Sequence, residues 1–300
     1  MATSSRTLVL LALIANGIIA VVKFAAAVIS GSSAMLAEGF HSLADTGNQL
    51  FLLRGTVVSR YAPDVQHPFG RGKELYFWSF MVAVFLFVGG AVVAFLEGLE
   101  KVLHPHESSG LAFSLVVLGA AALFEIFIAL RPALREFNRV RGSRSVMVTV
   151  RESRDSALIV VVFEDFAALA GLVIAAAGLV LAKVTGWQQW DGIASIAIAA
   201  LLASVAWFLA FEMKSLLIGE AATRKERSLI RSSALAMREV RSVRRLLTMQ
   251  LSPNDILVNM DVAFARGLNA DDLKVAIDKL EQSIRTAVPS ATRIFIEPEE

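Results

Sequence analysis

The chain has 300 residues, of which 56% are hydrophobic, and its mean hydropathy is +0.62. Soluble domains are only about 45–50% apolar, so this composition excludes a soluble globular protein and indicates an integral membrane protein. The absence of cysteine excludes disulfides and thiolate metal sites, so any metal must be held by His, Asp and Glu. The formal net charge is only +2, and nothing in the sequence resembles a nucleic-acid-binding module.

Six hydrophobic segments are long enough to cross a bilayer, which requires about 20 residues each. They are residues 8–29, 34–57, 77–96, 111–130, 157–184 and 193–211. The first segment exceeds the apolar part of a signal peptide, and further spans follow at once, so we expect it to be retained. The sequence therefore predicts a bundle of six transmembrane helices.

Basic residues are concentrated in two of the connections between these segments. The second-to-third and fourth-to-fifth connections are rich in Lys and Arg, whereas the other three are neutral or acidic. Because cytoplasmic loops carry the positive excess, both basic connections are predicted to be cytoplasmic. This alternation places both termini inside, and we expect the protein in a cytoplasmic (inner) membrane.

From residue 214 the sequence changes to mixed charge and predicts a separate domain. A helix is expected over 224–239, strands over 244–252 and 256–264, a helix over 270–288 and a strand over 292–297. The even positions from Ile256 to Phe264 are all apolar, the period of a half-buried strand. The order α-β-β-α-β predicts a cytosolic ferredoxin-like α+β domain. Two domains result, a transmembrane domain over 1–213 and a C-terminal domain over 214–300.

The second span carries polar residues that lipid would not tolerate. At about 100° per residue, a sector of roughly 80° of this helix contains four of them: Glu38, His41, Asp45 and Asn48. Ionisable side chains at membrane depth cost a few kcal/mol each and usually line an ion pathway or pair with one another. The alternative is that they only hydrogen-bond to neighbouring helices and fix packing. Three ionisable groups on one stripe favour an intramembrane site.

The spacing of these groups suits a metal ion. His41 and Asp45 are four residues apart, so both project from one face and can bind a single cation. A further ligand must come from another helix, and Glu164 and Asp165 of the fifth span are available. They point about 100° apart, so only one faces the centre squarely. With Asp165, one neutral imidazole and two carboxylates balance a divalent ion, and a fourth ligand would be Glu38, Glu164 or water. An imidazole with carboxylates favours zinc.

Three other charged residues in the spans are expected to be structural. Lys23, near the end of the first span, is predicted to extend to the interface or to pair with Glu97 at the matching depth. Glu125, near one end of the fourth span, is expected to pair with the cluster of Arg131 and Arg135.

These motifs resemble the cation diffusion facilitators, six-helix transporters of divalent metals with a cytosolic C-terminal domain. The resemblance covers nearly the whole chain and is carried by residues 31–45 (GSSAMLAEGFHSLAD), 67–74 (HPFGRGKE) and 215–220 (SLLIGE). It implies a tetrahedral site made by two pairs of ligands, each pair four residues apart. His41 and Asp45 match the first pair. Asp165 matches the second member of the other pair, whose first member falls on Val161, which cannot bind metal. The chain is similar to a branch with Glu-Asp at this place.

The resemblance also bears on the loop between the second and third spans. A loop zinc site of some members would include His67, but its second histidine is Arg71 here, so no metal is expected there. Lys73 is similar to a family lysine that pairs with an acid after the sixth helix near the dimer interface. Glu220 is the acid available in this chain.

The resemblance and the site together imply a function. We expect a proton-coupled efflux transporter of a divalent metal, with Zn²⁺ as cargo, that acts as a homodimer. No enzyme activity, resident cofactor or nucleic-acid partner is expected; the metal is a transported substrate and protons are the counter-ion. One alternative keeps the fold but transports Mn²⁺, Fe²⁺ or Co²⁺. Another is a non-transporting membrane scaffold.

Overall fold

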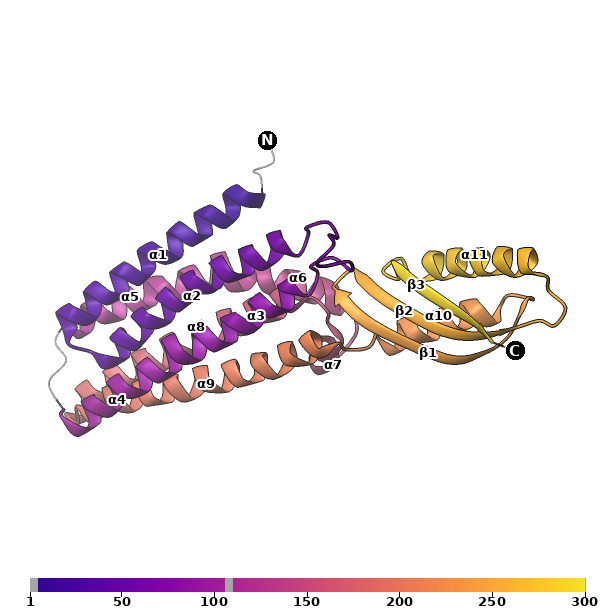
Figure 1. The fold of residues 1–300 in the computed structure, drawn as a ribbon. Coiled ribbons are helices and arrows are strands. Elements are labelled where there is room, and N and C mark those ends of the chain that lie inside the picture. Colours follow the sequence, from indigo (N-terminus) through magenta and orange to yellow (C-terminus); the bar gives the residue numbers. More distant parts are fainter. Residues whose placement is uncertain (1–4, 106–109, 300) are drawn as a thin grey trace. The chain divides into compact units, whose positions relative to one another are not determined.

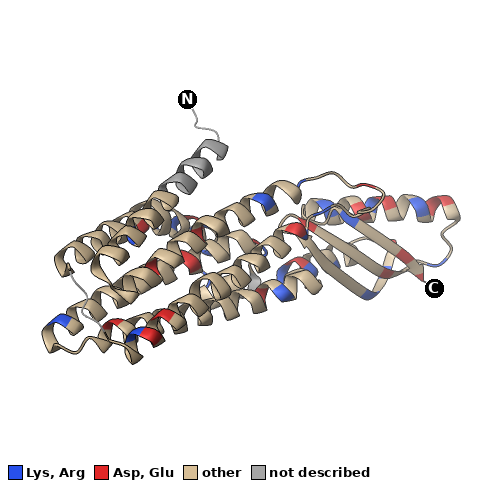
Figure 2. Cartoon of the chain, turned by 60° about the vertical axis from the view of Figure 1, so that its left-hand side comes forward, with Lys and Arg blue, Asp and Glu red and all other residues tan. Residues whose placement is uncertain are grey.

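The computed structural model describes residues 5–105 and 110–299, with side chains from residue 16 onward apart from residues 151–152. The chain forms two compact units. One comprises the residues up to Val57 together with Phe77–Met213, and the other comprises Val58–Tyr76 together with the residues from Lys214 onward. Charged residues are less frequent in the first unit than in the second (Figure 2).

The first unit is a bundle of long helices, shown in indigo to salmon in Figure 1. Within the described residues six helical segments follow the six predicted spans: α1 Ser5–Ser30; α2 Ser33–Val58; α3 Glu74–Phe85 with the π-helical turn η1 Leu86–Val92 and α4 Val93–Leu103; α5 Leu111–Phe124 with the π-helical turn η2 Glu125–Leu130 and α6 Arg131–Arg141; α8 Ser156–Thr185; and α9 Gln189–Ile218. The fold class is therefore confirmed. One short helix, α7 Val146–Glu152, was not predicted, and α6 continues beyond the predicted end of the fourth span.

Four of these segments, among the described residues, are long and apolar enough to cross a membrane: Glu74–Leu103, Leu111–Arg141, Ser156–Thr185 and Gln189–Ile218. The part of α1 whose side chains are described, Asn16–Ser30, is apolar but short. Helix α2 has the length, but its polar stripe lowers its hydropathy. The least apolar of the long helices thus carries the predicted site.

Small residues allow the helices to approach closely, as is usual where helices associate in a membrane. Gly98 of α4 and Gly192 of α9 face each other. A Cβ atom added at either position would lie 2.8 Å from the carbonyl oxygen of the other. This contact requires glycine on both sides.

We predict that Gly98→Ala destabilises the bundle by about 1–3 kcal/mol, because the added methyl group would overlap backbone that cannot easily move. Gly119→Ala in α5 is the matched control, since a Cβ there would have nothing within 4 Å. The control should be neutral or stabilising by up to about 1 kcal/mol, because alanine is the better helix former. Thermal unfolding in detergent measures both, and equal melting temperatures for the two variants would contradict the prediction.

The C-terminal residues of the second unit form a small α+β fold. The elements are α10 Arg224–Leu235, β1 Val240–Ser252, β2 Asp255–Phe264, α11 Ala270–Ala287 and β3 Arg293–Glu299. The predicted order α-β-β-α-β is confirmed. Within the described residues the strand order is β1-β2-β3, with β1 antiparallel to β2 and β2 parallel to β3. The alternating residues of β2, from Ile256 to Val262, are fully buried in its core.

One predicted boundary in this fold was wrong. The helix predicted over 224–239 ends at Leu235, and the strand predicted from residue 244 begins at Val240. Val240 pairs with Phe264 at the far end of β2. The length of β2 therefore sets where β1 begins, and residues that local sequence favours as helix become turn and strand.

The connection between α2 and α3 packs on this fold within the second unit. The ring of Phe69 lies 6.4 Å from that of Phe295 in β3, in an edge-to-face arrangement. A Cβ atom on Gly72 would lie 2.6 Å from the carbonyl oxygen of Leu251 in β1, so only glycine fits there. The guanidinium of Arg293 lies 5.5 Å from the centre of the Phe69 ring.

Candidate metal centre

Helix α2 turns its polar stripe toward the interior of the bundle. Glu38, His41 and Asn48 have no exposed surface, and Asp45 is also buried. Residues three and four apart on a helix share one face, so the same periodicity that groups these side chains in sequence buries them together. The predicted stripe is therefore removed from the surface.

The fifth-span acid that contacts this stripe is Glu164. Asn48 Nδ2 donates a hydrogen bond to Glu164 Oε1, and the carboxyl groups of Asp45 and Glu164 interact. Asp165 is only half-buried, and its Oδ2 atom has no hydrogen-bond partner among the described residues. Because α8 turns Glu164 toward α2, Asp165 lies to the side, where the charges of Glu164 and Glu125 act on it.

His41 is the side chain most clearly available to a ligand. Its Nδ1 atom lies 3.5 Å from Asp45 Oδ1, outside hydrogen-bonding geometry, and both ring nitrogens are buried without a hydrogen-bond partner among the described residues. The same holds for Asp45 Oδ1 and Asn48 Oδ1. Buried polar atoms are nearly always paired, because each unpaired one costs about 1–3 kcal/mol. These atoms have the chemistry of metal ligands.

The ligands are not gathered at a single point in this structure. Among the residues with described side chains, no group of three or more His, Asp and Glu is placed to hold one ion. The structure brings together Asp45, Glu164 and, through Asp45, His41. The four-ligand set stays a prediction, and forming it requires side chains or helices to move.

Glu38 has a different partner. Lys23 Nζ of α1 lies 3.1 Å from Glu38 Oε2 and donates a 2.7 Å hydrogen bond to Ser42 Oγ. The side chain of Lys23 is only 1% exposed, so the predicted snorkelling or pairing with Glu97 is wrong. The fully buried Glu38 carboxylate is a closer partner for the Lys23 ammonium group than water at the membrane interface. Gly171 of α8 lacks the Cβ atom that would overlap Glu38 Oε1.

Glu125 also belongs to the interior. It is buried at the start of the π-helical turn η2, and the charges that act on it are those of Lys23 and Glu38. Its own charge acts on Asp45, Glu164 and Asp165. The predicted pairing with the arginine cluster is therefore not what the structure shows, and Arg131 lies over the ring of Phe127. π-Helical turns inside α-helices, such as η2, are frequent at functional sites. The sequence signal for Glu125 as a functional residue was an acid inside an apolar run.

Asp191 fixes the start of α2. It is fully buried and accepts hydrogen bonds from Ser32 Oγ at 2.8 Å, Ser33 N at 3.1 Å and Ala34 N at 3.3 Å. A carboxylate at a helix N-terminus satisfies free N–H groups and complements the helix dipole. Asp191 stands at the start of α9, so this contact joins α9 to the helix that carries the site.

In the second unit, His67 lies in an ion-pair cluster. Its backbone N–H donates to Asp64 Oδ1 at 2.6 Å, and its Nδ1 atom lies 3.2 Å from the same oxygen. Arg71 Nη2 donates to Asp64 Oδ2 at 2.8 Å. The hydrogen bond from Arg71, with that from the His67 backbone, lowers the pKa of Asp64 to about 2. The Arg71 guanidinium thus supplies the positive charge beside this carboxylate.

Lys73 lies where the end of α9 meets β1, within the second unit. Its Nζ atom donates to the carbonyl oxygen of Leu217 at 3.2 Å and lies 3.6 Å from the sulfur of Met249. Glu220 Oε2 accepts a hydrogen bond from Ser215 Oγ at 3.5 Å. Lys73 therefore contacts the segment that contains Glu220, and the predicted pair with this acid stays a prediction.

Comparison with known proteins shows which family this chain matches. Residues 9–218 match the family described as the cation efflux transmembrane domain. The chain is 33% identical over 214 residues to the mitochondrial proton-coupled zinc antiporter SLC30A9 of Homo sapiens, a match that covers 70% of this chain and 37% of that protein. It is 35% identical over 221 residues to metal tolerance protein C4 of Arabidopsis thaliana, covering 72% of this chain and 48% of that protein.

A shorter match joins the chain to the magnetosome protein MamM of Paramagnetospirillum magneticum, with 34% identity over 117 residues, 39% of this chain and 36% of that protein. The chain thus spans less than half the length of these relatives. The family match, however, extends from the first membrane helix to the last residue of α9. This protein belongs to the cation efflux family, the cation diffusion facilitators, whose members transport cations across membranes.

Proposed function

We propose that the protein is a proton-coupled antiporter of a divalent metal, with Zn²⁺ as its cargo. The observation that carries the proposal is the buried pair His41 and Asp45: the ring nitrogens of His41 and the Oδ1 atom of Asp45 have no hydrogen-bond partner among the described residues, and the carboxyl group of Asp45 interacts with Glu164 of α8. Imidazole and carboxylate ligands suit zinc. A zinc antiporter is among the relatives that match 70% of the chain.

Charge balance supports a single divalent ion at this place. Lys23 already compensates Glu38, so Glu38 is not needed as a ligand. The ionised carboxylates of Asp45 and Glu164 then carry two negative charges, which one divalent cation neutralises. Burying a balanced set limits the unfavourable desolvation of each ion. The charge of Glu125 acts on Asp45 and Asp165, and we propose that Glu125 and Asp165 carry protons to and from this set.

Exchange follows from competition for the same atoms. Metal binding requires a neutral imidazole and ionised carboxylates, so loading releases protons. On the more acidic side His41 and a carboxylate take protons back, because imidazole changes its protonation in the physiological range. The ligands are not gathered in this structure, so we propose that movement of α2 relative to α8 assembles the site during alternating access.

The proposal also covers the topology, the membrane and the oligomeric state of the protein. The basic connections between the second and third and between the fourth and fifth spans support cytoplasmic termini in a cytoplasmic (inner) membrane. We propose a homodimer with no resident cofactor, in which the C-terminal α+β fold is cytosolic. No covalent step is required.

The test is exchange by the purified full chain in proteoliposomes. A zinc gradient should drive proton movement, recorded with a pH-sensitive dye inside the vesicles. If no metal gradient drives proton movement, the result would contradict the proposal and favour the scaffold alternative. Competition by Mn²⁺, Fe²⁺ and Co²⁺ in the same assay tests the alternative cargoes, which the carboxylate of Glu164 motivates.

The two acids of α8 should differ in this assay. Glu164→Gln keeps an oxygen for Asn48 but removes a charged ligand beside Asp45, so we expect roughly tenfold or greater loss of exchange. Asp165 is half-buried and lies to one side of the stripe, so Asp165→Asn should reduce exchange less. A larger loss for Asp165→Asn than for Glu164→Gln would show that the fifth-span ligand is Asp165.

A further inference from the structure

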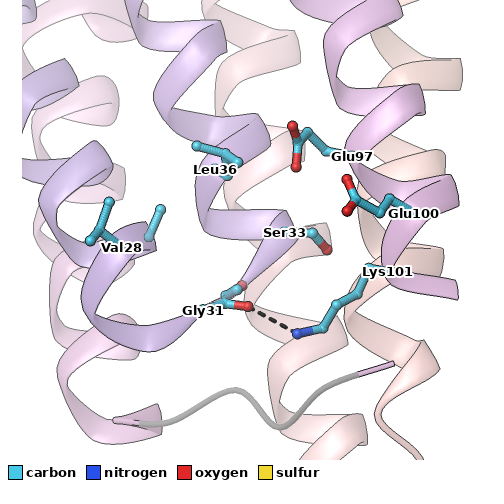
Figure 3. Close-up of a pocket in the computed structure, with 9 residues that line it drawn as sticks. Val28, Gly31, Ser33, Leu36, Glu97, Glu100 and Lys101 are labelled. Atoms are coloured by element: carbon cyan, nitrogen blue, oxygen red, sulfur yellow. Dashed lines mark hydrogen bonds between the residues drawn. The ribbon is translucent and has the colours of Figure 1, made fainter. Parts of the chain in front are cut away.

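A cavity separate from the His41 centre lies at the end of the first unit where α1 and α4 end and α2 begins (Figure 3). Its volume is about 200 Å³. Apolar residues such as Val28 and Leu36 form much of its wall, and four lining residues have oxygen-bearing side chains: Ser32, Ser33, Glu97 and Glu100. The hydroxyl group of Ser32 already donates to Asp191. None of these residues belongs to the His41 centre.

The cavity is negatively charged. Glu97 and Glu100 are one turn apart on α4, and the charge of Glu100 acts on Glu97. Lys101 also lines the cavity, but its Nζ atom donates to the carbonyl oxygen of Gly31 at 2.9 Å and lies 3.9 Å from Asp191 Oδ2. Asp191 thus balances Lys101. The two glutamates leave an excess of negative charge on the cavity among the described residues.

Ser33 gives an independent sign that the cavity holds a ligand. The residue is 6% exposed, and its Oγ atom is buried without a hydrogen-bond partner among the residues with described side chains. Its backbone N–H is satisfied by Asp191, so only the hydroxyl group is left over. In Figure 3 the side-chain oxygens of Ser33, Glu97 and Glu100 lie around the same space. A buried hydroxyl without a partner is unfavourable unless something in the cavity pairs with it.

We propose that this cavity binds a divalent cation through the carboxylates of Glu97 and Glu100 and the hydroxyl oxygen of Ser33. A water molecule needs only about 10–15 Å³ of such volume, so the cavity accommodates an ion together with several of its waters. Glu97 is half-buried and Glu100 exposed, which leaves a path to solvent. Carboxylate, hydroxyl and water oxygens suit hard ions such as Mn²⁺, Mg²⁺ and Ca²⁺. The inference goes beyond the proposed antiport, because binding here requires neither His41 nor Asp45.

The probe is Mn²⁺, whose free and bound forms differ in electron paramagnetic resonance. The background is the full chain with His41→Ala, Asp45→Ala and Glu164→Gln, which removes the ligands proposed for the central site and isolates this cavity. This background should still bind Mn²⁺. Adding Glu97→Gln and Glu100→Gln should weaken binding by roughly tenfold or more, and adding Ser33→Ala by roughly threefold. The matched control is Asp278→Asn with Glu281→Gln, a pair with the same spacing on α11, which should change nothing.

Two results would overturn the proposal: no Mn²⁺ binding by the background variant, or unchanged affinity after both glutamates are neutralised. Glu97 and Glu100 are not fully buried, so their neutralisation should leave the melting temperature unchanged, which is checked on the same samples. Zinc-driven exchange by the unmodified chain is scored separately. Failure of the cavity to bind therefore leaves the antiport proposal standing, and failure of exchange leaves the cavity proposal standing.

Discussion

Replacing His41 or Asp45 with alanine should abolish zinc-driven proton movement in proteoliposomes, with a loss of more than about a hundredfold. Mutating even the outer-shell partners of metal ligands commonly costs about 10- to 100-fold, and these two residues are proposed as direct ligands. Alanine at either position removes both a site for the metal and a site for the competing proton.

These variants should remain folded, which keeps the experiment interpretable. The ring nitrogens of His41 have no hydrogen-bond partner among the described residues, so alanine there breaks no such bond. Leu43→Ala is the control on the same helix, since this side chain is half-exposed on another face. Size-exclusion profiles and melting temperatures establish folding. If His41→Ala and Asp45→Ala both exchange as the unmodified chain does, the site is elsewhere.

The largest expected effect on stability is that of Lys23→Met. The change keeps most of the side-chain volume but leaves the Glu38 carboxylate, which is fully buried, without its counter-ion. Removing one partner of a buried ion pair typically destabilises by about 3–5 kcal/mol, because the other charge is left uncompensated. Ser42 Oγ also loses its donor. We expect a marked fall in the apparent melting temperature in detergent.

A double variant separates loss of the pair from loss of packing. Adding Glu38→Gln to Lys23→Met removes the stranded charge and should restore most of the lost stability, since replacing both partners of a buried pair is often near neutral. Lys183→Met, at the exposed end of α8, is the control for loss of a lysine. Equal melting temperatures for the single and double variants would show that the ion pair does not set the stability of this region.

Much of the architecture was predictable because it depends on local pattern. The membrane helices follow from the lengths of the apolar runs, and the C-terminal order α-β-β-α-β follows from the switch between helical and strand periods. The exceptions lie where a distant partner decides. The start of β1 at Val240 is set by its pairing with Phe264, which no local preference contains.

The candidate site divides in the same way. The sequence by itself determined that Glu38, His41, Asp45 and Asn48 share one face of α2, because a fixed rotation per residue decides this. Only the tertiary structure decided which side chains meet that face. Glu164 rather than Asp165 turns toward Asp45, Lys23 pairs with Glu38 instead of Glu97, and Asp191 holds the start of α2. The physical reason is that each helix can rotate about its own axis, and packing against several neighbours at once selects one rotation.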